Sequence, residues 1–168
     1  MSHLLHEIQM KAVGCVMHLR ENKSQMLFSQ AFTSIATQLD LDDVGYFYNP
    51  NNSDLLLTTP GQMVGIMNNN RLPTYQFGVA VSKAVFVIKT IDEDYDKLLV
   101  IATDYAKETD MYYFKKAIEE CESAVILYAF GKKNTPSLAE YCKSQPKIKF
   151  FENQDIKDVE TMLQSIIL

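Results

Sequence analysis

The chain has 168 residues, 47% of them hydrophobic, and its 16 basic and 21 acidic residues give a formal net charge of -5. A chain of this size buries roughly two thirds of its unfolded surface in one core, so we expect a single domain over residues 1–168. The acidic balance argues against a nucleic-acid surface, because phosphate binding needs clustered lysine and arginine.

The first ten residues and the cysteines indicate the cellular compartment of the protein. Residues 1–10 lack the basic start and the long apolar core of a secretion signal, and no run approaches the length of a membrane span. Cys15, Cys121 and Cys142 cannot all pair, and apolar neighbours predict buried free thiols in a reducing compartment. We therefore expect a cytoplasmic protein without a membrane partner. A nucleophilic Cys15 beside His18 stays open as an alternative, although a cysteine in a strand core usually packs.

The first half of the chain begins with a short apolar run at residues 11–17, typical of a buried strand. Ser24 is a candidate N-cap for a helix that runs to about Leu39, because apolar residues recur at spacings of three and four. Residues 44–48 and 54–58 are two β-like runs joined by a turn-forming cluster, which predicts an antiparallel hairpin. A short helix is expected within residues 61–70.

The second half alternates helices and strands. Residues 76–88 predict a heavily buried helix, residues 97–102 a buried strand, and Asp110 can cap a helix through residue 120. Residues 124–130 are the clearest central strand, and Pro136 suits the first turn of a helix capped by Thr135. Residues 147–151 predict an edge strand and residues 155–167 a final helix. This order predicts an α/β fold with a mostly parallel sheet and helices on both faces.

The same order, with one antiparallel hairpin after the first helix, resembles the von Willebrand factor A (vWA) family. A strand ends in Thr103-Asp104, another ends in Phe130-Gly131, and Pro73-Thr74-Tyr75 is similar to the threonine loop of that family. The resemblance implies a three-layer, Rossmann-like fold. Its six-stranded sheet would be mostly parallel, with one antiparallel edge strand.

In the vWA family a dication is held by an Asp-x-Ser-x-Ser motif, a threonine and a further aspartate. Thr74 and Asp104 match the last two positions, but the first motif reads His18, Arg20 and Asn22 at its three ligand positions. The Arg20 side chain stays cationic and has no atom that could act as a metal ligand or hydrogen-bond acceptor, so it would repel a dication. We interpret these five residues as the positions of a degenerate metal site and expect no metal and no cofactor. Arg20 either pairs with Asp104 or points to solvent, and both remain open.

Other chemistry has weaker support in the sequence. His18, Glu21 and Asp104 could imitate a transition-metal site, but a hydrogen-bonded loop histidine is the commoner arrangement. A hydrolase triad of His18 and Asp104 with Ser24 or Ser29 lacks the Gly-x-Ser-x-Gly turn. The spacing of the six glycines fits neither a dinucleotide-binding turn nor a phosphate-binding loop.

The resemblance implies a non-catalytic interaction module, an adaptor or scaffold subunit of an intracellular assembly. Its partner would be another protein, with Glu21, Tyr75 and Tyr105 as candidate contacts, and self-association is left open. The alternative is an enzyme, or a protein that binds a small ligand or metal, with its site in the crevice at the carboxyl ends of the central strands.

Overall fold

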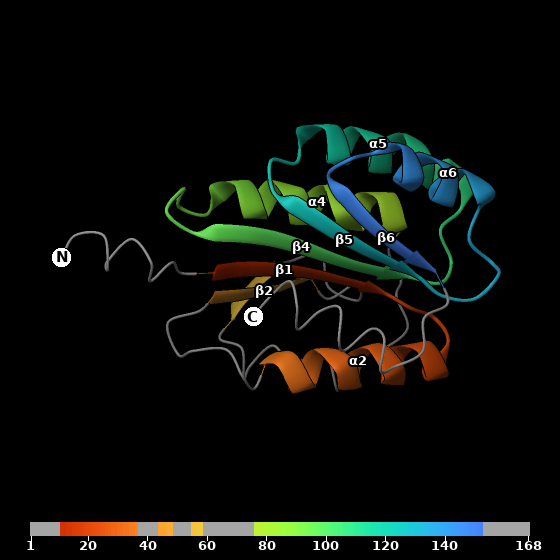
Figure 1. The fold of residues 1–168 in the computed structure, drawn as a ribbon, viewed down its shortest axis with the longest axis horizontal. Helices are drawn as coiled ribbons and strands as arrows, with labels where there is room; N and C mark the ends of the chain where they lie inside the picture. The colour runs from red at the N-terminus through yellow and green to blue at the C-terminus, as the bar shows by residue number, and fades with distance from the viewer. Residues whose placement is uncertain (1–10, 37–43, 49–54, 59–75, 153–168) are drawn as a thin grey trace.

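The computed structural model describes residues 11–36, 44–48, 55–58 and 76–152 (Figure 1). The expected short helix within residues 61–70 and the expected final helix at residues 155–167 lie outside the described residues. In chain order the elements are β1 (Lys11–His18), α2 (Asn22–Ala36), β2 (Val44–Tyr48), β3 (Leu55–Thr58), α4 (Phe77–Thr90), β4 (Asp96–Thr103), η1 (Glu108–Asp110), α5 (Met111–Glu120), β5 (Ala124–Ala129), α6 (Pro136–Ser144) and β6 (Ile148–Glu152).

The strands form one sheet in the order β3-β2-β1-β4-β5-β6. β1 pairs in parallel with both β2 and β4, and β5 pairs in parallel with both β4 and β6. β2 and β3 pair antiparallel, as expected of the hairpin. The predicted α/β class with a parallel sheet is therefore confirmed, and β1, β4 and β5 are neighbours in it. The strand order reverses between β1 and β4, which is where open α/β sheets place their ligands.

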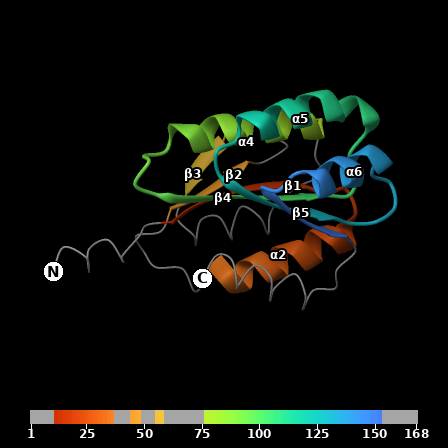
Figure 2. The same ribbon diagram turned by 45° about the horizontal axis from the view of Figure 1, so that its top comes forward.

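The central strands are apolar because both of their faces are covered. Residues 98–103 of β4 and 125–129 of β5 are all buried. Helices α4, α5 and α6 cover one face, and α2 lies on the other (Figures 1 and 2). Val16, Ile101 and Leu127 point toward α4 and α5 in one continuous cluster. On the opposite face Phe28 of α2 packs against Tyr128, with ring centroids 6.3 Å apart. Alternate residues along each strand thus pack against opposite helical layers.

Helices α4 and α5 approach each other closely at Gly78. A Cβ atom at this position would lie 2.5 Å from the backbone oxygen of Asp110. The Asp110 carboxylate accepts hydrogen bonds from the backbone N–H of Gly78, at 3.2 Å, and from that of Lys107, at 2.8 Å. We predicted Asp110 as the cap of α5, but its side chain makes no such bond. It closes the η1 turn and joins that turn to α4 instead.

Two further predictions concern helix starts. Thr135 accepts a hydrogen bond from the backbone N–H of Ser137, with Pro136 following it, so the predicted cap of α6 is confirmed. The prediction of Ser24 as the N-cap of α2 is wrong, because the helix begins at Asn22 and includes Ser24. Among the helices that the structure describes, none is both long and apolar enough to cross a membrane.

Candidate functional site

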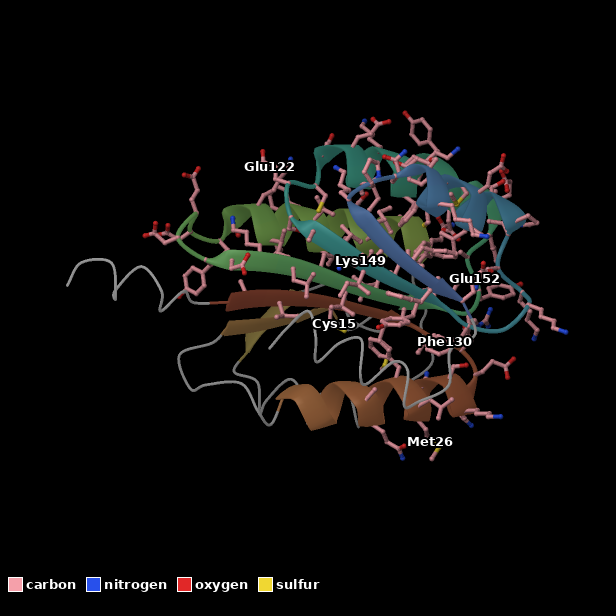
Figure 3. The ribbon with its side chains drawn as sticks, viewed as in Figure 1. Cys15, Met26, Glu122, Phe130, Lys149 and Glu152 are labelled. Atoms are coloured by element: carbon pink, nitrogen blue, oxygen red, sulfur yellow. The ribbon has the colours of Figure 1, made fainter. Side chains whose placement is uncertain are left out.

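The loops that follow β1, β4 and β5 meet at the carboxyl edge of the sheet, at the right-hand end of Figure 1. We call residues 18–22, 104–110 and 130–135 the loop face. Figure 3 places Phe130 and Glu152 at this end of the molecule and Glu122 at the other. Parallel strands bring all three loops to one edge, so residues more than 80 positions apart in the chain become neighbours.

The carboxylate of Asp104 holds the β1–α2 loop in place. The backbone N–H of Arg20 lies 2.9 Å from Oδ1 and 3.0 Å from Oδ2 of Asp104, and the N–H of Glu21 donates to Oδ2 at 2.9 Å. Asp104 is only 2% exposed. Hydrogen bonds to an ionised acceptor are stronger than neutral ones. Both carboxylate oxygens are therefore committed to the two amides that precede α2.

His18 lies on the other side of the sheet from this contact. Its Nδ1 is 3.1 Å from the hydroxyl oxygen of Thr103, and its ring packs against Phe77 with centroids 5.5 Å apart. The side chain is 4% exposed. No group of three or more histidine, cysteine or acidic side chains that could hold a metal occurs among the described residues. The transition-metal alternative of His18, Glu21 and Asp104 is therefore not assembled, and His18 is a hydrogen-bonded histidine at a strand end.

Arg20 contacts Asp104 through its backbone and directs its side chain elsewhere. The guanidinium carbon lies 4.9 Å from the centroid of the Tyr105 ring, and Lys107 Nζ lies 5.3 Å from the same centroid. The ion pairs between described residues are Lys133–Glu21 and Lys143–Glu152. The Arg20–Asp104 ion pair that we considered is therefore not formed. The backbone amide of Arg20, and not its guanidinium, binds the carboxylate.

The other predicted site residues divide between exposed and undescribed positions. Glu21 is exposed, and its carboxylate lies 3.5 Å from Lys133 Nζ of the β5–α6 loop. An exposed pair of this kind contributes little to stability. Asn22 is exposed at the first position of α2, and Tyr105 is partly buried. Thr74 and Tyr75 lie outside the described residues.

Asn134 is a structural residue of the loop face that sequence reasoning missed. Its Oδ1 accepts the N–H of Ala106 at 2.7 Å, and its Nδ2 donates to the carbonyl oxygens of Phe130, at 3.2 Å, and Thr103, at 3.4 Å. The side chain thus joins the β4–α5 and β5–α6 loops. The available signal was an asparagine three residues after the strand-ending Gly131, a type that commonly bonds to backbone in loops.

A pocket of about 230 Å³ lies beside the loop face, between α6 and the carboxyl ends of β5 and β6. Small-ligand sites usually have volumes of about 300 to 1,000 Å³ with several convergent polar groups. Of the polar lining residues, Asn134 and Thr135 are already hydrogen bonded within the protein and Glu152 pairs with Lys143, whereas Lys132 is exposed. The pocket therefore gives the small-ligand alternative little support.

The three cysteines are free and buried, as predicted. Burial raises the pKa of the Cys15 thiol far above its usual range and that of Cys142 to about 12. Only the thiolate is strongly nucleophilic. Cys15 and His18 are three positions apart along β1, and side chains alternate between the faces of a strand, so the two side chains point to opposite faces. The arrangement does not support a nucleophilic Cys15.

Comparison with known proteins identifies the fold only through structure. Neither a scan of protein-family models nor a search of curated proteins gives a match. A von Willebrand factor type A structure from Catenulispora acidiphila superposes with a TM-score of 0.67 at 11% identity, over 94% of this chain and 42% of that one. The chain has a vWA-like fold.

Two larger proteins carry the same fold. The mussel byssus proximal thread matrix protein 1 gives a TM-score of 0.61 at 10% identity, over 95% of this chain and 47% of that one. The pilus adhesin SpaC of Lactobacillus rhamnosus GG gives 0.63 at 9% identity, over 94% and 29%. This chain therefore spans less than half the length of each of the three matched chains. Identities this low establish the vWA-like fold and nothing finer.

Members of the vWA family hold a dication at the loops that correspond to the loop face, so the described residues can be tested for their fit to one. A hard cation needs several oxygen ligands with negative charge. Asp104 gives both of its oxygens to backbone amides, His18 is buried against Thr103 and Phe77, and Arg20 brings positive charge to the loop. The described residues therefore do not fit a dication.

Proposed function

We propose that this chain is a non-catalytic protein-interaction module that uses the loop face without a metal ion, as an adaptor or scaffold part of an intracellular assembly. The observation that carries the proposal is the bonding of Asp104 to the amides of Arg20 and Glu21. It fixes the loop through the protein's own hydrogen bonds. The positions His18, Arg20, Asn22, Thr74 and Asp104 are then a degenerate form of the cation site.

Two features of the loop face favour protein binding over catalysis. Bonds through Asn134 and Asp104 tie the loops to one another, and preorganised loops lose little entropy on association. Arg20 and Lys107 are exposed and lie over the partly buried Tyr105 ring, and tyrosine and arginine are enriched among residues that dominate interfaces. The Thr103 hydroxyl lies 3.1 Å from Nδ1 of His18, but both side chains are buried, so this pair presents no nucleophile at the loop face. Glu21, Tyr75 and Tyr105 remain our candidate partner contacts.

The proposal predicts that a photo-crosslinking amino acid at position 132 captures a partner protein in cells that produce the chain. Lys132 is exposed on the loop face. The matched control places the same amino acid at Lys89, which is exposed in the last turn of α4 at the opposite end of the sheet. We expect a discrete crosslinked band from position 132 and none from position 89.

The same partner at both positions, or no partner at position 132, would contradict the proposal. A crosslink from position 132 to a small molecule rather than a protein would favour the alternative of a ligand-binding domain.

A further inference from the structure

The exposed charges of the loop face have the opposite sign to the chain as a whole. The chain carries a formal net charge of -5. The exposed charged residues of the loop face are the cations Arg20, Lys107, Lys132 and Lys133 and the carboxylates Glu21 and Glu108. Both carboxylates have partners: Glu21 pairs with Lys133, and Glu108 accepts a hydrogen bond from Thr135. Four exposed cations against two exposed carboxylates leave a formal surplus of two positive charges among the exposed side chains, and the buried Asp104 and Asp110 balance it in the loop face as a whole.

Two of these cations share one aromatic ring. Arg20, from the β1–α2 loop, and Lys107, from the β4–α5 loop, both lie about 5 Å from the centroid of Tyr105. Neither is in an ion pair with any residue that the structure describes. Both buried acids of the loop face already accept hydrogen bonds from backbone amides: Asp104 from Arg20 and Glu21, and Asp110 from Gly78 and Lys107. The two like charges repel each other, and a bound anion would relieve that repulsion.

From this geometry we infer that the Arg20–Tyr105–Lys107 cluster binds a carboxylate side chain of an acidic segment in a partner protein, with no metal between them. The inference rests on the proposed function and names the chemistry of the partner. A guanidinium binds a carboxylate through two parallel hydrogen bonds, and an ammonium beside it adds a second positive charge. The tyrosine ring gives the bound segment an apolar surface.

The surroundings favour a carboxylate over a phosphate. Phosphate sites in proteins commonly use several free backbone amides at a helix N-terminus. At the start of α2, the amides of Arg20 and Glu21 already donate to Asp104.

The inference can be tested by NMR titration of the full chain with two capped pentapeptides, Gly-Glu-Leu-Glu-Gly and its glutamine counterpart, at low salt and with chelator present. We expect saturable shifts of the Arg20 Nε–H and the Tyr105 ring with the glutamate peptide only. Arg20→Gln and Lys107→Gln should each weaken binding by about fivefold. Lys115→Gln is the matched control, because Nζ of Lys115, on α5, likewise lies over a tyrosine ring, 5.4 Å from the centroid of Tyr141 on α6, and it should leave binding unchanged.

Equal binding of the glutamine peptide, shifts confined to other residues, or no saturable shift would each overturn the inference. The inference would also be overturned, in favour of a small-anion site, if inorganic phosphate shifted the same Arg20 and Tyr105 signals and bound more tightly than the glutamate peptide. A partner crosslinked at position 132 that still binds Arg20→Gln and Lys107→Gln unchanged would refute the inference while leaving the proposed function intact.

Discussion

Replacing Leu127 with alanine should destabilise the protein by about 2 to 5 kcal/mol, as measured by urea unfolding. Leu127 is fully buried in the middle of β5, and its side chain belongs to the cluster beneath α4 and α5. Its strand has neighbours on both sides, β4 and β6. The loss combines the transfer free energy of the removed carbon atoms with the cavity that a covered sheet cannot close.

The matched control is Phe86→Ala, which removes a larger side chain that is 70% exposed on α4. It should change the unfolding free energy by less than about 0.5 kcal/mol. If Leu127→Ala cost no more than Phe86→Ala, β5 would not lie at the centre of the core.

The second large effect is expected at Asp104. Asp104→Ala should cost about 2 to 4 kcal/mol, because the N–H groups of Arg20 and Glu21 lose their shared acceptor in a partly buried setting. The loop before α2 should then open more readily. Amide hydrogen exchange at Arg20 and Glu21 should quicken more than exchange in β5, which reports global unfolding.

Asp92→Ala is the control for this change. Its carboxylate accepts the N–H of Asp94 at 3.1 Å, the same kind of bond, but in an exposed turn. We expect an effect within about 0.5 kcal/mol. A comparable cost for the two variants, or unaltered exchange at Arg20 and Glu21 in Asp104→Ala, would show that Asp104 does not hold the loop.

The fold was predictable because its signals are local. Buried parallel strands are continuous apolar runs, and the ends of residues 97–102 and 124–130 differ from those of the observed β4 and β5 by at most one residue. The apolar stripe of residues 76–88 similarly predicted α4. Thr135 and Pro136 gave the start of α6 because an N-cap and a following proline act within one turn.

The site was less predictable because its bonds join a side chain to distant backbone. The sequence correctly placed Asp104 at the carboxyl edge of the sheet. No side-chain pattern shows that the amides of Arg20 and Glu21, 84 and 83 positions away, will donate to its oxygens. That contact also lies directly before α2, which begins at Asn22 rather than after Ser24. Asn134 was missed for the same reason, because all three of its partners are backbone groups.

Calorimetric titration of the chain with magnesium, calcium and manganese, paired with thermal melting with and without chelator, tests the central claim most directly. Since Asp104 is committed to backbone amides and Arg20 adds positive charge, we predict no binding heat and the same melting temperature in both conditions. Binding with a dissociation constant on the order of micromolar, or a rise in melting temperature that chelator removes, would contradict the account.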